Sequence, residues 1–169
     1  FYFSRWIFLR TLAITYVIQF FNFGLQASGL IGPQGLMPAA KVLTAQGFWG
    51  HLFAFLAHPS LLWFNDSEAW IQIIWMGGIV TSIAALCGLG QKLAFALSWF
   101  LYLSLAQAGW GYMNLPWEKL LLEAGFLAIF FSPTHWIPTA LIKQPRPPRV
   151  YRWLLVFLLF RVMFGVIWV

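Results

Sequence analysis

Three charged side chains fall inside long apolar stretches of the sequence: Arg10, Glu123 and Arg161. A charge in hydrocarbon costs about 2.5 to 3.5 kcal/mol even by mild scales, so such residues usually mark function or are paired. A rise of 1.5 Å per residue puts Glu123 roughly 9 Å inside one interface and Arg161 about half-way along its stretch, whereas Arg10 can snorkel. The sequence therefore predicts a buried ion pair between Glu123 and Arg161. Such a pair can fix helix register alone, or it can act directly on a ligand or a proton.

Histidines offer the other possible chemistry, as metal or haem ligands. His51 and His58 lie two turns apart along one helix face, too far to hold one ion unless Pro59 bends the segment. Neither they nor His135 have a cysteine or carboxylate at ligand spacing. The sequence also lacks a nucleophile–base arrangement, a phosphate-binding glycine loop and paired carboxylates. We therefore expect no metal, no cofactor and no catalytic residue, and the sequence favours a protein that is not an enzyme.

The composition indicates what surrounds these residues. Of the 169 residues, 62% are hydrophobic and only 8% are charged, whereas a soluble domain carries about a quarter charged residues. Lipid must therefore cover most of the outside. The formal net charge of +6 is spread thinly along the chain, which suits a topology signal and anionic headgroups better than nucleic acid. We expect an integral membrane protein that contacts membrane lipids and binds no nucleic acid.

Long apolar stretches predict an all-α fold, a bundle of about five transmembrane helices, because a bilayer core needs roughly 20 helical residues. The predicted spans are residues 5–26, 68–89, 93–110, 117–136 and 151–169. Residues 28–64 are expected to form an outer loop rich in glycine and proline, followed by an interfacial or re-entrant helix over 48–64. Residues 138–149 contain QPRPPR and are expected to form a basic cytoplasmic linker. We expect residues 1–169 to be one transmembrane domain of a longer protein.

Basic residues determine the orientation expected for this bundle. With the N-terminus inside, the cytoplasmic side collects Arg5, Lys92, Lys143, Arg146, Arg149 and Arg152. The outer side keeps only Lys41 and Lys119 as basic residues. Because cytoplasmic loops carry the excess of Lys and Arg, we expect a cytoplasmic N-terminus and an outer loop on the opposite side.

Small residues mark where the helices are expected to approach one another. Gly77, Thr81 and Ala85 repeat at every fourth position of the second span. Ala124 and Ala128 do the same on the fourth span. Such stripes let membrane helices pack closely. The two alanines flank the acidic member of the predicted ion pair on a helical wheel, so that carboxylate is expected to face the interior of the bundle.

Three stretches resemble a known family. Residues 30–39, LIGPQGLMPA, are similar to the loop after the first span of the lipase maturation factor family. Residues 116–133, PWEKLLLEAGFLAIFFSP, resemble that family's most recognisable run, and residues 152–165, RWLLVFLLFRVMFG, fit its next span. The resemblance picks out the motif residues Gly32, Gly35, Pro38, Trp117, Glu118, Glu123, Gly125 and Arg161. The family usually shows Asp where Glu118 stands.

The resemblance implies a folding or assembly factor rather than a catalyst. Animal members lie in the endoplasmic reticulum membrane and assist the folding and dimer assembly of secreted lipases, and bacterial relatives lie in the inner membrane. The family's long C-terminal part, which includes a soluble domain, lies outside this chain. Our first hypothesis is thus a lipase maturation factor-like protein whose partners bind its outer loops. Two alternatives stay open: a structural or accessory subunit of a larger membrane complex, and a membrane enzyme or carrier that uses Glu123.

Overall fold

Helices make up all the regular structure in the part of the chain that the computed structural model describes, which is residues 2–36, 38, 59–65, 67–109, 116–133 and 149–165. The elements are α1 (Tyr2–Leu30), the short 3-10 helix η1 (Leu61–Trp63), α4 (Glu68–Cys87), α5 (Gln91–Ala108), α6 (Pro116–Phe131) and α7 (Arg149–Gly165). The expected all-α fold is therefore confirmed for these residues. The helix predicted over residues 48–64 and the linker over 138–148 fall mainly outside them.

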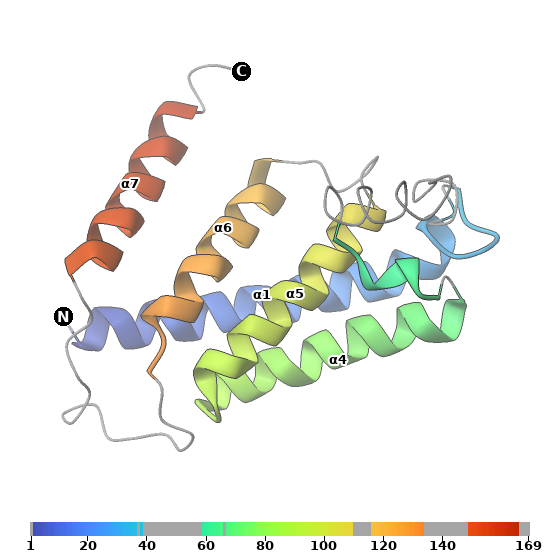
Figure 1. Cartoon of the computed structure of the whole chain (residues 1–169), viewed down its shortest axis with the longest axis horizontal. Helices are drawn as coiled ribbons and strands as arrows, with labels where there is room; N and C mark the ends of the chain where they lie inside the picture. The colour runs from blue at the N-terminus through green and yellow to red at the C-terminus, as the bar shows by residue number, and fades with distance from the viewer. Residues whose placement is uncertain are drawn as a thin grey trace.

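Successive long helices run in alternating directions (Figure 1). α1 packs along α4, α4 packs on α5, α5 packs on α6, and α6 packs on α7. α1 also contacts α5 and α6, so it is the central helix of the bundle. α7 stands at the edge, beside α6 (Figure 1). The N-terminus of α1, the α4–α5 turn and the start of α7 consequently share one end of the molecule.

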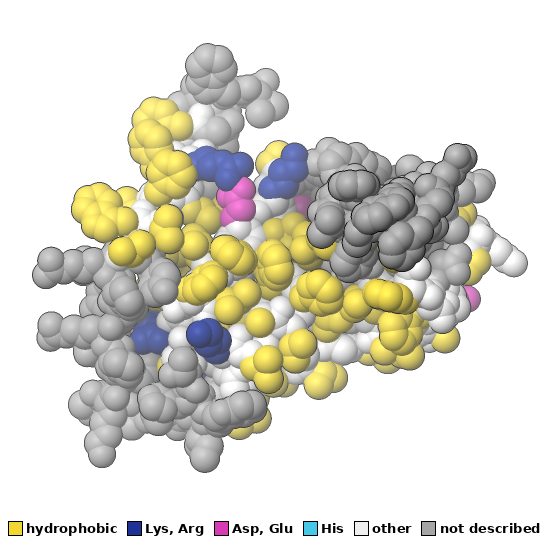
Figure 2. All heavy atoms as spheres, in the orientation of Figure 1, with side chains coloured by type: hydrophobic (Ala, Val, Ile, Leu, Met, Phe, Trp, Pro, Cys, Tyr) yellow, Lys and Arg dark blue, Asp and Glu magenta, His cyan; other side chains and the backbone are white. Residues whose placement is uncertain are grey.

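Two helices are long and apolar enough to cross a membrane by length and composition, over Phe3–Leu30 and Glu68–Cys87. Large hydrophobic side chains are exposed along every long helix, including Ile14, Val80 and Phe157. Figure 2 shows hydrophobic side chains spread over the visible face, with few charged ones among them. A surface of this kind suits contact with lipid and not with water.

The first helix is longer than predicted. Ser28 and Gly29 belong to α1, which ends at Leu30, whereas the sequence predicted a loop from residue 28. A glycine alone weakens a helix without ending it. Termination comes at Gly32 and Pro33, since proline disfavours helical geometry in the residue before it. α7 likewise begins at Arg149, whereas the sequence predicts a linker through residue 149.

Glycines shape the hairpin of α4 and α5. Gly88 ends α4 with φ 84° and Gly90 precedes α5 with φ 47°, a left-handed conformation that glycine adopts without steric cost. Above the turn, Ser98 Oγ donates to Thr81 Oγ1 at 2.9 Å, and Ser82 Oγ lies 3.2 Å from Ser98 Oγ. Hydroxyl contacts between helices satisfy polar groups that lipid cannot. The turn and these hydrogen bonds hold α4 and α5 as one antiparallel pair.

Candidate functional site

A buried polar contact joins α5 to the first turn of α6. The hydroxyl of Tyr102 donates a hydrogen bond to Oε2 of Glu118. Tyr102 is fully buried and Glu118 is only 7% exposed. A carboxyl group in the first turn of a helix also meets the positive end of the helix dipole. Glu118, a motif residue at the edge of the predicted fourth span, therefore ties the start of α6 to the middle of the bundle.

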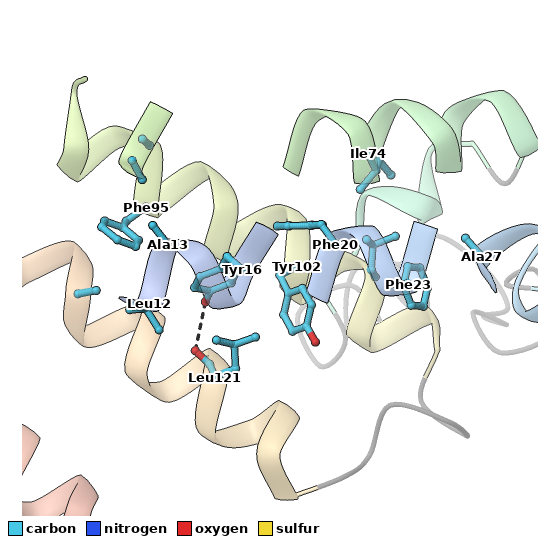
Figure 3. Packing of buried hydrophobic residues seen from close by; sticks show 14 of the residues in the cluster. Leu12, Ala13, Tyr16, Phe20, Phe23, Ala27, Ile74, Phe95, Tyr102 and Leu121 are labelled. Carbon is cyan, nitrogen blue, oxygen red and sulfur yellow. Dashed lines mark hydrogen bonds between the residues drawn. The ribbon is translucent and has the colours of Figure 1, made fainter. Parts of the chain in front are cut away.

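Aromatic rings from α1 pack against the ring of Tyr102 (Figure 3). The ring of Tyr102 meets those of Tyr16 and Phe20 edge-on, with centroids 5.7 Å and 5.5 Å apart. Edge-to-face aromatic pairs stabilise a core by about 0.5–1.5 kcal/mol beyond their buried area. Three helices, α1, α5 and α6, thus meet around one buried carboxyl group.

Further along α6 from Glu118, a glycine lets α1 and α6 come into close contact. Tyr16 Oη donates a hydrogen bond of 3.1 Å to the backbone oxygen of Leu121 (Figure 3). In an α-helix that oxygen faces residue 125, four positions later. A Cβ atom at Gly125 would overlap the Tyr16 hydroxyl and lie 2.8 Å from its Cζ. The absence of a side chain at Gly125 is therefore what lets the tyrosine reach the backbone of α6.

Glu123 and Arg161 form the ion pair that joins α6 to α7. The prediction that this pair is buried is wrong for the described chain, because the Arg161 side chain is 59% exposed and that of Glu123 37%. The interior face of α6 carries Glu118, Leu121, Gly125 and Ala128. Glu123 lies away from that face, so it reaches the peripheral helix α7 and not the centre of the bundle.

Of the small residues predicted to pack on α4, Thr81 and Ala85 lie in helix contacts, whereas Gly78 and not Gly77 makes the close approach to α1. A Cβ atom at Gly78 would overlap the Phe20 ring of α1, whereas at Gly77 it would meet only Leu101 Cδ1, at 3.7 Å. Thr81 belongs to the α4–α5 hydrogen bonds, and Ala85 is fully buried. On α6, Ala128 is fully buried while Ala124 is half-buried against the core. Close helix approach thus depends on Gly78 and Gly125, beside the predicted stripes.

The motif glycines of the first loop stabilise the turn that ends α1. Gly35 donates to the oxygen of Gly32 at 2.9 Å, and Leu36 donates to the oxygen of Gly29 at 3.0 Å. A Cβ atom at Gly35 would lie 2.7 Å from the oxygen of Leu30. This turn therefore has no room for a side chain at residue 35. Pro38, the remaining motif residue of this loop, is half-buried.

Trp117 lies next to the buried carboxyl group but on the outside of α6. Its side chain is 56% exposed, at the end where α6 begins. Tryptophan favours membrane interfaces, where its ring is partly apolar and its N–H can reach water. The Trp–acid pair of the motif therefore divides into an outward tryptophan and an inward Glu118.

Sequence reasoning missed the central role of Tyr16 and Tyr102. Both lie in the middle of apolar stretches, where a hydroxyl must find a partner within the protein. A tyrosine in the middle of an apolar stretch was therefore the sequence signal that could have identified both residues. It also missed the burial of Arg5, which is 5% exposed with its guanidinium carbon 5.5 Å from the ring centre of Phe131. A cation over an aromatic face is stabilised there, so Arg5 holds the start of α1 to the end of α6.

The described residues offer helix-to-helix contacts and no metal centre. No three side chains among His, Cys, Asp and Glu come together in the described ranges to hold a metal ion. The histidines considered as ligands, His51, His58 and His135, lie outside those ranges. The contacts among the described residues hold the helices together around a polar contact in their core.

Comparison with known proteins identifies the family. The family described as "Lipase maturation factor transmembrane domain" matches residues 3–167. Lipase maturation factor 2 of Gallus gallus is 39% identical over 173 residues, which cover 95% of this chain and 23% of that protein. The protein of the same name from Xenopus tropicalis is 37% identical over 171 residues, 96% of this chain and 24% of that protein. Lipase maturation factor 1 of Mus musculus is 31% identical over 174 residues, 98% of this chain and 30% of that protein.

No solved structure matches the chain. The chain spans about a quarter of the length of the lipase maturation factor 2 proteins that it matches. The resemblance seen in the sequence is confirmed across nearly all of its residues. This integral membrane chain therefore belongs to the lipase maturation factor family and corresponds to its transmembrane domain.

Proposed function

We propose that this chain is the membrane-spanning part of a factor that assists the folding or assembly of other proteins. Its relatives are named as maturation factors for lipases. The match to the family's transmembrane domain over residues 3–167 is the observation that carries the proposal. Its described interior supports it, because the buried Tyr102–Glu118 contact fixes helices in place. The helices would hold client-binding parts of the protein at the membrane.

Restoring lipase secretion tests this function. Animal cells lacking their own lipase maturation factors would be given the natural full-length protein that carries this chain. Secreted, active lipase is expected to reappear with the full-length protein, and not with a version in which Glu118→Leu disrupts the contact at the start of α6. A membrane-inserted, stable full-length protein that restores no secretion of any lipase tested would overturn the proposal.

The proposed topology has five spans, formed by α1, α4, α5, α6 and α7, as one domain with a cytoplasmic N-terminus. The alternating helix directions support it, because they put Arg5, Lys92 and Arg149 at one end of the bundle. In a Cys87→Ala background, Gln144→Cys is expected to react with an impermeant maleimide only from the cytoplasmic side, and Gln34→Cys only from the other. The reverse pattern, or both on one side, would contradict it. The endoplasmic reticulum and the bacterial inner membrane are the two compartments that fit.

The ion pair between Glu123 and Arg161 is proposed to lock the fourth span to the fifth. Its position supports this role, since α7 packs mainly on α6 and the pair crosses their boundary. Partner proteins would then bind outside the bundle, through the outer loops or through exposed helix faces.

A subunit of a larger membrane complex is the second candidate, and the exposure of α7 favours it. Val156, Phe157 and Leu159 are all more than half exposed and point in different directions around the helix. Native mass spectrometry of gently solubilised protein separates the two functions. A stable partner in fixed ratio would favour the complex, whereas a lone chain that retains client proteins would favour the folding factor.

A further inference from the structure

One face of α6 is charged at its beginning and aromatic further along. Lys119, Glu123, Phe126 and Phe130 follow one another at spacings of three or four residues, so they share a side of the helix. We call these four residues the α6 stripe. Lys119 is exposed, and Phe126 and Phe130 remain 45% and 43% exposed. The stripe thus offers polar groups near one membrane interface and apolar rings deeper in.

The facing helix repeats this order in the opposite chain direction. Arg161, Phe157, Leu154 and Val150 are again spaced by three or four residues, and we call them the α7 stripe. Phe157 and Val150 are 62% and 63% exposed. Because α6 and α7 are antiparallel, the charged ends of both stripes lie at the same end of the bundle (Figure 1). The ion pair between Glu123 and Arg161 joins the two stripes there.

The charges at this junction do not balance. On the outward side of α6, Lys119 and Arg161 are basic and Glu123 is acidic, which leaves one positive charge there, because Glu118 is buried in the bundle against Tyr102. Lys119 makes no ion pair or hydrogen bond with any other described residue. Figure 2 shows basic and acidic side chains gathered where α6 and α7 come together, above a hydrophobic area on α6. An exposed charge near hydrocarbon is stabilised by an anion from the interface, so the junction suits a negatively charged group.

The depth of the junction matches a lipid headgroup. Lys119 lies about 3 Å inward of Trp117 along α6, and Glu123 about 9 Å. Lysine and arginine side chains reach several ångströms toward the interface, where lipid phosphates lie. A soluble anion would make no contact with the exposed apolar side chains of the two stripes, which include Phe126 and Phe157. A phospholipid supplies both the phosphate and the acyl chains.

We propose that the junction of the two stripes binds an anionic phospholipid, with its phosphate between Lys119 and Arg161 and its acyl chains along the exposed rings of the α6 and α7 stripes. The lipid neutralises the surplus positive charge and covers the ion pair on its exposed side. It would also bridge α6 and α7 beside their ion pair.

Site-specific photolabelling tests the proposal. The full-length protein is reconstituted in phosphatidylcholine vesicles that contain a minor fraction of phosphatidylglycerol with a photoreactive acyl chain. Labelled peptides are then mapped by mass spectrometry. Labelling of α6 and α7 is expected to fall about fivefold in Lys119→Gln, since one basic residue contributes that much to the attraction of an anionic lipid. Lys119→Arg should retain the labelling.

Lys92→Gln is the matched control, because it removes the same charge from an exposed lysine on α5 at the other end of the bundle. It is expected to leave the labelling of α6 and α7 unchanged. Equal labelling by photoreactive phosphatidylcholine, or equal loss in both lysine variants, would overturn the proposal. It would also fail if the stripes of the folded wild-type protein were unlabelled, because another helix would then cover them. None of these outcomes depends on lipase secretion.

Discussion

The contact between Tyr16 and Gly125 gives the sharpest test of how α1 and α6 are held together. In Gly125→Ala the new Cβ would occupy the position of the Tyr16 hydroxyl and approach Cζ to 2.8 Å. The ring must then move, which breaks its hydrogen bond to the Leu121 oxygen. We expect Gly125→Ala to destabilise the bundle, although alanine is the better helix former.

The expected size follows from three contributions. Overpacking of a filled interior costs about 1–3 kcal/mol. Loss of the hydrogen bond from Tyr16 costs about 1 kcal/mol. The higher helix propensity of alanine offsets about 1 kcal/mol. The free energy of unfolding should therefore fall by about 1–3 kcal/mol in Gly125→Ala.

Unfolding by sodium dodecyl sulfate in mixed micelles, followed by circular dichroism, measures these free energies. Gly77→Ala is the matched control, since its Cβ would meet only Leu101 at an ordinary 3.7 Å, and it should be neutral or slightly stabilising. Tyr16→Phe removes the overlapping oxygen, so Gly125→Ala should cost at least about 1 kcal/mol less in that background. Additive effects within about 0.5 kcal/mol, or equal stability of the two alanine variants, would refute the reasoning.

Two further substitutions probe the polar contacts of α6 by the same unfolding measurement. Glu123→Leu should lower stability by about 2–3 kcal/mol, because it leaves Arg161 charged and without its carboxylate at the membrane; adding Arg161→Leu should recover most of the loss, and no recovery would argue against the ion pair. Glu118→Leu should cost about 1–3 kcal/mol by leaving the buried Tyr102 hydroxyl without its acceptor. Tyr102→Phe should restore part of that loss, whereas a further decrease would show that the contact is not what stabilises α6.

Helix positions were the part of the fold that the sequence predicted well. The predicted span over residues 68–89 matches α4, Glu68–Cys87, and Gly88 ends it in a left-handed conformation. Apolar length and glycine turns are local properties, so they can be read without knowledge of the neighbours. The end of α1 was missed because Ser28 and Gly29 resemble loop residues, while the actual break depends on Pro33.

The direction in which each side chain faces was harder to predict, because it depends on which helix is the neighbour. Glu123 and Arg161 were paired from their depths alone, yet depth does not say whether a pair lies inside the bundle or on its edge. The pair lies at the edge because α7 packs on a flank of α6. Gly77 and Gly78 illustrate the same difficulty, since adjacent glycines point about 100° apart and only the Phe20 ring of α1 decides which one is needed.

The length of α1 has a consequence for the turn at its end. Its 29 residues rise about 43 Å, whereas the hydrocarbon core measures about 30 Å. Even with an ordinary tilt of about 20°, roughly 10 Å of helix extends past the core. Since Arg5 anchors the beginning of α1 against α6, the surplus emerges at Leu30. The glycine turn that follows Leu30 therefore lies beyond the hydrocarbon core, by a distance that decreases as the bilayer thickens.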